Sequence, residues 1–303
     1  MTGRKLKPFK PKGDEFISIL IKICGYSSIL FVTLILLFLL REGLPALTDV
    51  PLSSIFSTTW YPIEGYFGIL PLFLGTLLVT IAATIIALPF GIGTAVYLSE
   101  VAPDWMKEIL KPVVEILAGI PSVVLGFIGI LVLVPFMRQF FNLPTGLTAI
   151  TGAILLGIIA IPTIVSIAED ALNNVPPAYR QAALALGATR WQTIWGVTLP
   201  AAKSGVLTAV MLGVGRALGE TMAVMMVTGN APVMPTQWNS LFMPVRTMTA
   251  TIASEMGEVA TGSQHYQVLF LIGIIIFLLS LIVNVTASAV STRQRKRAER
   301  ILS

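Results

Sequence analysis

Charge is scarce in this sequence, and so are the residues that bind metals or form disulfides. Only 12% of the 303 residues are charged and 55% are hydrophobic, whereas a soluble domain carries about 25% charge. Because so few charges cannot cover a water-facing surface, the composition predicts an integral membrane protein. The single cysteine, Cys24, excludes an internal disulfide. The single histidine, His265, leaves no cluster that could hold a metal.

The sequence also lacks the usual ATP-binding loop. Neither the pattern G-x4-G-K-[ST] nor any Gly-Lys pair occurs. We therefore expect no ATP or other cofactor on this chain, no metal site and no catalytic residues. The chain is not expected to be an enzyme.

Six apolar runs are long enough for transmembrane helices, which need about 20 residues to cross the hydrocarbon. The first run is longer than a signal-peptide core and is predicted to be retained. Pro89 and Pro121 predict irregularities in the second and third runs, and Pro162 lies in the fourth. The six runs cover residues 16–40, 77–98, 112–137, 147–168, 201–228 and 267–291.

Around these runs, the chain divides into a basic tail (1–15), an N-terminal helix (16–40), an outer loop (41–67), a five-helix core (68–291) and a second basic tail (292–303). Lysine and arginine concentrate in loops on the cytoplasmic side of a membrane. If both termini are inside, 16 of the 20 lysines and arginines lie on the inner side. The other four are Arg41, Arg138 and Arg246 on the outer side and Arg216 within the membrane. The charge bias therefore predicts a multi-pass protein with both termini in the cytoplasm.

A polar stretch, residues 173–200, separates the fourth and fifth runs. Its Pro176-Pro177 pair predicts the start of a helix, and Gly187 predicts a left-handed cap that ends it. A second short helix is expected before Pro200 closes the stretch. The pattern favours a helix-turn-helix facing the cytoplasm, and the alternative is an ordinary cytoplasmic hairpin.

The spacing of this stretch resembles the EAA loop of ABC importer permeases, E-A-A-x3-G-x9-I-x-L-P. Gln181 replaces the glutamate and Val197 the isoleucine, so an ion pair made by that glutamate is not expected. In the family, this loop is the coupling helix that docks into a groove of the ATPase subunit. The resemblance assigns that role to Arg180, Gln181, Ala182, Ala183, Gly187, Trp191, Leu199 and Pro200.

The fifth run carries two charges at predicted mid-bilayer depth. Arg216 lies about 22 Å along a helix from Ala201, at 1.5 Å per residue, and Glu220 follows one turn later on the same face. A charge there costs about 2.5–3.5 kcal/mol and must face water, protein or a partner charge. We predict that Arg216 attracts an oxyanion in the transport pathway while Glu220 holds it at rest. The alternative is a structural ion pair between helices.

Small and hydroxyl-bearing residues recur at four-residue spacing. In the fifth run, two such rows predict close helix packing. In the second run, three threonines either line the pathway or bond the preceding turn of their own helix. The rows are Gly205, Ala209, Gly213, Ala217 and Thr221; Gly215 and Gly219; and Thr76, Thr80 and Thr84.

The two outer loops also carry patterns. Trp60, Tyr61 and Tyr66 in the first are expected in the interfacial aromatic belt. Loop 229–266 has apolar residues at three- and four-residue intervals, which predicts an amphipathic helix over about 245–259, either lying along the outer face or forming part of a docking surface. At the inner end of the fourth run, the adjacent carboxylates Glu169 and Asp170 are expected to interact with headgroups or with coupling-loop groups such as Arg180 or Arg190.

Residues 213–230, GVGRALGETMAVMMVTGN, together with the EAA-type loop and six predicted spans, are similar to PstC-type permeases of bacterial phosphate importers. The resemblance implies an all-α, MetI-like type I ABC importer core with one extra N-terminal helix. It implies that phosphate is moved into the cytoplasm by alternating access across the bacterial cell (inner) membrane. The implied partners are a PstA-type permease, two PstB-type ATPases holding ATP and Mg²⁺, a PstS-type extracytoplasmic phosphate-binding protein and membrane lipids, with no nucleic acid.

Reasoning from the residues leaves other functions open. A sulfate or molybdate permease would also use an oxyanion-facing arginine. A stand-alone anion carrier or channel would need coupling sites of its own, and few intramembrane ionisable residues are available for them. A membrane scaffold would gain little from charges at mid-bilayer.

Overall fold

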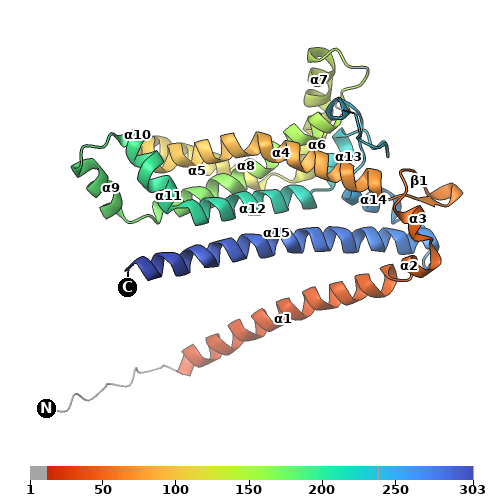
Figure 1. Ribbon diagram of the computed structural model, residues 1–303, viewed down its shortest axis with the longest axis horizontal. Coiled ribbons are helices and arrows are strands. Elements are labelled where there is room, and N and C mark those ends of the chain that lie inside the picture. Colours follow the sequence, from red (N-terminus) through yellow and green to blue (C-terminus); the bar gives the residue numbers. More distant parts are fainter. Residues whose placement is uncertain (1–11, 238, 303) are drawn as a thin grey trace.

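The computed structural model describes the backbone of residues 12–237 and 239–302, and the side chains of residues 16–237 and 239–289. Within these residues the fold is helical apart from one two-stranded hairpin (Figure 1). The basic side chains of the tails 1–15 and 292–303, on which the predicted orientation partly depends, lie outside the described residues.

Long helices form the body of the molecule. α4 (Leu70–Val96), α8 (Ala149–Asn173) and α12 (Lys203–Gly219) pack against one another, and α15 (Gln264–Leu302) packs along α12. Among the described residues, five helices are long and apolar enough to cross a membrane. The pair 190–201 and 203–219, bent by 72°, gives a sixth span if it is taken as one. The predicted all-helical membrane fold is confirmed, although its fifth span is built from bent pieces.

Small residues bring α12 close to α8. A Cβ added to Gly213 would come within 2.6 Å of Ile164 Cγ1 on α8, so no larger residue fits there without movement. Gly205 is equally close to Ala171 of α8, and Ala209 between the two glycines is fully buried. The first predicted small-residue row is therefore a packed seam, as expected for helices that associate in lipid.

The third predicted span, 112–137, has different bounds, because the irregularity predicted at Pro121 is a complete helix break. α5 (Asp104–Gly119) ends before Pro121, and the chain resumes as α6 (Ser122–Ile128), the π-helical turn η3 (Gly129–Leu133) and α7 (Val134–Phe140). A proline disfavours helical backbone at the residue before it, and Ile120 is extended with ψ 127°. The segment that spans is 122–140, while α5 packs against α8.

The predicted helix-turn-helix is confirmed. It consists of α9 (Pro177–Ala185), α10 (Arg190–Thr193), the π-helical turn η4 (Ile194–Thr198) and α11 (Leu199–Ala201). Gly187 has φ +83°, the left-handed conformation expected of a cap. Thr189 and Gln192 form a reciprocal capping box at the start of α10. The 72° bend into α12 follows directly after α11.

The outer loops fold at the opposite end of the molecule (Figure 1). Residues 41–67 form α2 (Ala46–Asp49), α3 (Leu52–Ile55) and the antiparallel strands β1 (Trp60–Tyr61) and β2 (Tyr66–Phe67) around the 3-10 turn η1 (Pro62–Glu64). Further along the chain lie α13 (Met222–Val227), the 3-10 turn η5 (Ser240–Phe242) and α14 (Met248–Glu255).

Two predictions for these loops are wrong. Trp60 is only 3% exposed and packs edge-on against Phe67, so it lies in the core and not in an aromatic belt; Tyr61 and Tyr66 are exposed. α14 is shorter than the predicted helix. Its first turns are buried against α4 and α15 and do not lie along the outer face.

The N-terminal helix α1 (Lys12–Gly43) lies at the periphery. It meets α15 near its own C-terminal end, where a Cβ on Gly43 would come within 2.8 Å of Ile274 Cδ1. No part of its most apolar segment is buried against the rest of the described chain. Toward its N-terminal end, α1 moves away from α15 (Figure 1). The start of α1 and the end of α15 both lie at the end of the molecule that carries α9 (Figure 1).

Candidate functional site

Two helix breaks lie side by side in the bundle. α5 ends at Gly119 and α6 begins at Ser122, while α12 ends at Gly219 and α13 begins at Met222. α6 packs directly on α13. Irregular backbone at membrane depth is tolerated where protein buries it or where it lines a water-filled cavity. The paired breaks are therefore the candidate substrate site.

Arg216 connects the two breaks. Its Nη1 donates to Thr163 Oγ1 of α8 at 2.8 Å, and its Nη2 donates to the carbonyl oxygen of Ala118, at the end of α5, at 3.5 Å. The last carbonyls of a helix carry partial negative charge, which favours a cation there. A guanidinium has five N–H donors, so these two contacts leave donors for an oxyanion.

The predicted pair between Arg216 and Glu220 is wrong. Glu220 follows the end of α12 in extended conformation, with ψ 129°, and is not one helical turn further along the same face. Its carboxylate accepts from the N–H groups of Thr221 at 3.1 Å and Ala223 at 3.4 Å, which caps α13. The prediction failed because it assumed one continuous helix from 201 to 228.

The second predicted glycine pair does not form a packed seam. A Cβ added to Gly219 would meet no atom within 4 Å, and one added to Gly215 would meet only Val283, at 3.9 Å. Gly119, at the end of α5, has the same open surroundings as Gly219. These two glycines leave space beside the breaks that Arg216 joins.

The threonines of α4 do not face this space. Thr76 is 4% exposed; it donates to the carbonyl of Leu72 and accepts from the N–H of Met248 at the start of α14. Thr80 is 5% exposed. In this structure both lie inside the packed bundle. The alternative of bonding the preceding turn of their own helix holds for Thr76 and for Thr84, which donates to the carbonyl of Thr80 at 2.8 Å.

The stretch 173–200, called the coupling stretch below after its predicted role, has large exposed apolar side chains at the end of the molecule that carries α9. Leu186 is 89% exposed, Trp191 61% and Trp195 56%. Exposed apolar patches of this kind mark sites of contact with another protein or with the membrane. Of the predicted docking residues, Gln181, Ala182, Gly187, Trp191 and Pro200 are exposed, Leu199 is half-buried and Ala183 is buried. A shallow groove runs between Tyr179, Ala182, Ala183, Leu186, Ala188 and Val197.

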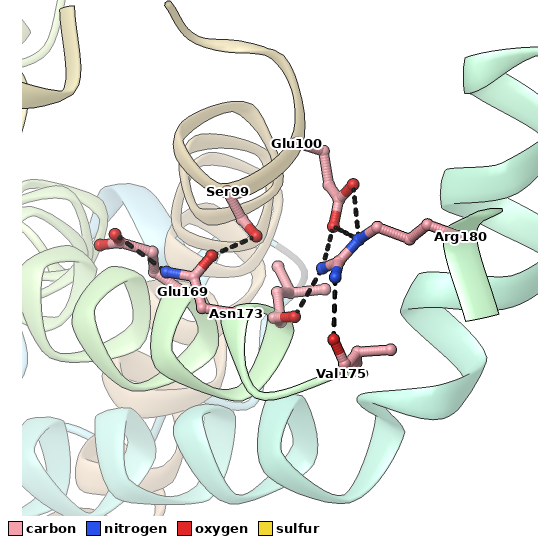
Figure 2. Close-up of polar contacts among 7 residues, drawn as sticks. Ser99, Glu100, Glu169, Asn173, Val175 and Arg180 are labelled. Atoms are coloured by element: carbon pink, nitrogen blue, oxygen red, sulfur yellow. Dashed lines mark hydrogen bonds and ion pairs between the residues drawn. The ribbon is translucent and has the colours of Figure 1, made fainter. Parts of the chain in front are cut away.

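Arg180, which was expected on the docking surface, points into the chain (Figure 2). Its nearest guanidinium nitrogen lies 2.6 Å from Glu100 Oε1, in the turn after α4. Glu169 contacts neither of the arginines named for it, Arg180 and Arg190. It accepts from Lys111 at 3.5 Å and from Asn173, the first residue of the stretch 173–200, at 3.4 Å.

At the end of the molecule opposite α9, Glu255 lies in a polar cluster that no sequence pattern indicated. The Glu255 carboxylate contacts Arg246 Nη1 at 2.7 Å, His265 Nε2 at 2.8 Å and Trp60 Nε1 at 3.2 Å. The cluster fastens the first outer loop and α14 to the start of α15. No local pattern could have revealed it, because Trp60 and Glu255 are 195 positions apart in the chain.

Comparison with known proteins agrees with this architecture. Residues 87–296 match the family described as "Binding-protein-dependent transport system inner membrane component". The "Probable ABC transporter permease protein YqgH" of Bacillus subtilis is 42% identical over 81% of this chain and 79% of its own length. The "Phosphate transport system permease protein PstC" of Xylella fastidiosa is 33% identical over 97% of this chain and 95% of its own length.

Solved structures have the same fold. A chain of the MetNI methionine ABC transporter, in inward-facing conformations, aligns with a TM-score of 0.54 and 22% identity over 72% of this chain and 93% of its own. A chain of a bacterial alginate ABC transporter aligns with a TM-score of 0.57 and 15% identity, over 92% of this chain and 97% of its own length. At these identities the likeness concerns the fold alone.

Proposed function

The chain belongs to the family of binding-protein-dependent transport system inner membrane components, and from this membership we propose that it is the permease subunit of an ATP-driven importer of inorganic phosphate. The observation that carries the proposal is its 33% identity with a protein named as a phosphate permease, over nearly the full length of both chains. The site around Arg216 supports the choice of substrate, because a guanidinium fork can bond two oxygens of a tetrahedral oxyanion together.

The proposed importer contains other chains. A permease of this kind works with ATPase subunits and an extracytoplasmic binding protein. Here we expect a second permease of the PstA type, two PstB-type ATPases and a PstS-type phosphate-binding protein. ATP and Mg²⁺ stay on the ATPases, so this subunit is not itself an enzyme. The exposed coupling stretch, with Leu186, Trp191 and Trp195, supports docking of an ATPase at this end.

Docking there would fix the orientation of this multi-pass membrane protein. An ATPase hydrolyses cytoplasmic ATP, so the end that carries α9 would face the cytoplasm. The start of α1 and the end of α15 lie at the same end (Figure 1). Both termini would therefore be cytoplasmic, in agreement with the positive-inside bias of the sequence.

In the proposed transport cycle, Arg216 offers phosphate a transient contact. Thr163 and the carbonyl of Ala118 hold the guanidinium in place without neutralising its charge. Among the described residues, no ion pair involves Arg216. An anion that enters through the open space beside Gly119 and Gly219 can bind there and leave when the pathway changes its exposure.

The test is co-purification of the tagged chain, followed by uptake of radiolabelled phosphate into liposomes with ATP inside or outside. We expect a second permease and an ATPase to co-purify. We also expect ATP-dependent uptake that falls at least about tenfold in Arg216→Gln, because a hydrogen bond to a charged group contributes about 1.5–3 kcal/mol. Uptake should stay unchanged in Arg41→Gln, whose side chain is 83% exposed at the opposite end from α9.

Other outcomes would change the proposal in defined ways. The same partners with uptake of sulfate or molybdate would keep the importer and replace the substrate. An assembled Arg216→Gln complex with normal uptake would remove Arg216 from the pathway. Transport by the chain alone would refute the importer.

A further inference from the structure

One guanidinium fastens three helix ends together at the inner end of the molecule (Figure 2). Arg180 of α9 donates through Nε and Nη2 to the carboxylate of Glu100, at 3.0 Å and 2.6 Å. The same side chain donates to the main-chain carbonyls of Leu172 and Val175, each at 2.8 Å, where α8 ends. The side chains of Arg180 and Glu100 are 23% and 9% exposed. Such a forked pair fixes orientation as well as distance, and removing one partner of a buried pair is strongly destabilising.

Glu100 lies in the π-helical turn η2 (Tyr97–Val101), which continues α4 without a break. Its neighbour Ser99 donates to Asn173 Oδ1 of α8 at 2.8 Å, and Asn173 in turn donates to Glu169 (Figure 2). Lys111 of α5 contacts the same oxygen of Glu169. Wide turns of this type recur at functional sites. Through two adjacent residues, the inner end of α4 is therefore tied to α8 and α9, and α5 is tied to α8.

α4 extends from this junction to the outer end. Its 27 residues span about 40 Å at 1.5 Å per residue. Near its outer end, Thr76 Oγ1 accepts from the N–H of Met248 at 3.0 Å, and Gly75 lies directly against the carbonyl of Arg246. α5 ends at the carbonyl that Arg216 contacts. A displacement applied at the inner junction can thus reach both the outer loops and the Arg216 site.

From these contacts we propose that the Glu100–Arg180 pair is the link that converts movement of α9 into movement of α4 and α5. The inference rests on the proposed function, in which an ATPase drives α9. Arg180 is then a positioning residue that transmits displacement, while the ATPase itself touches the exposed apolar residues around it. A purely structural pair would behave differently: its loss would lower the amount of assembled complex but would not alter the phosphate moved per ATP.

The test compares ATP hydrolysis and phosphate uptake on the same proteoliposomes that hold the whole complex. In Arg180→Gln we expect hydrolysis to persist while phosphate moved per ATP falls about tenfold, within the usual range of coupling effects. Glu100→Gln should act in the same direction. Arg180→Lys should lie between, since an ammonium keeps the charge but lacks the rigid planar fork that meets the carboxylate through two nitrogens. Lys203→Gln, an exposed cation at the start of α12, is the matched control and should leave the ratio unchanged.

An assembled Arg180→Gln complex with an unchanged ratio of phosphate to ATP would overturn the proposal. A second measurement does not depend on the substrate. Spin labels at two exposed positions, Ala185 on α9 and Val101 at the end of η2, would report their separation in a Cys24→Ser background.

Between the nucleotide-free and the vanadate-trapped complex, we expect this separation to stay constant with Arg180 present and to change in Arg180→Gln. Identical behaviour of the two proteins would also refute the link. If the wild-type complex moves another anion or none, the proposed substrate fails, while the spin-label result still decides the mechanical role.

Discussion

Substitution of Glu255 by glutamine should loosen the outer end of the protein. The carboxylate accepts from Arg246, His265 and Trp60, which belong to three separate segments of the chain. An amide of the same shape has one accepting oxygen instead of two and carries no charge. Arg246, whose side chain is 15% exposed, would then keep its bond to Ser254 but lose its only ion pair among the described residues.

The size of the effect follows from this geometry. Removing one partner of a buried ion pair costs about 3–5 kcal/mol, and partial exposure of both side chains here reduces that to roughly 2–4 kcal/mol. The loss should appear as easier local opening, because the carboxylate joins the first outer loop, through Trp60, to α14 and to His265 of α15. Since each 1.4 kcal/mol is a factor of ten, amide protection in residues 52–69 should fall by roughly 30- to 700-fold.

Hydrogen exchange measured by mass spectrometry on the intact complex would check this. Glu258→Gln removes an exposed carboxylate three positions away and is the matched control. We expect faster exchange in residues 52–69 for Glu255→Gln alone, with the membrane helices unchanged. Equal exchange in the two variants would show that the cluster does not hold the outer loop and would refute the reasoning.

Three further predictions concern the packed seam, the Arg216 site and the coupling turn. Gly213→Val should lower the melting temperature, since overpacking against α8 costs about 1–3 kcal/mol, whereas Gly219→Ala should not. Equal melting temperatures for the two variants would contradict close packing of α12 on α8 at Gly213. Thr163→Val removes a hydrogen bond to the Arg216 guanidinium, and a bond to a charged group is worth about 1.5–3 kcal/mol. Because Arg216 is then no longer held in place, the KM for phosphate should rise about tenfold or more. An unaltered KM would show that this bond does not position Arg216. Gly187→Val forces a branched residue to φ +83°, at a cost of about 1–2 kcal/mol, and should reduce the amount of ATPase that co-purifies. Recovery of the full amount of ATPase would argue against docking at this turn.

Features set by neighbouring residues were predictable from the sequence. The apolar runs predicted membrane helices because helix length and bilayer thickness match. The cap at Gly187 followed from local backbone preference, and the structure has it at φ +83°. The seam around Gly213 followed from four-residue spacing, which places small side chains on one helix face.

One group of failed predictions depended on where a helix ends. Arg216 and Glu220 would share a face only in a continuous helix, and α12 stops between them at Gly219. No proline stands at that point, and a single glycine such as Gly219 is often tolerated within a helical pattern, so the sequence did not show that the helix stops there. Beyond the break, α13 packs against α6 and α14, and Glu220 caps it.

By itself, the sequence determined that this protein lies in a membrane and how many apolar segments it has, and it predicted which stretch meets a partner, because hydrophobicity, periodicity and turn chemistry are local properties. Only the tertiary structure decided which polar groups meet. Arg180 joins Glu100 from 80 positions away, and Arg216 reaches Thr163 across 53. Every arginine has the same donor fork and every carboxylate the same acceptors, so the choice of partner depends on which helix ends packing brings together.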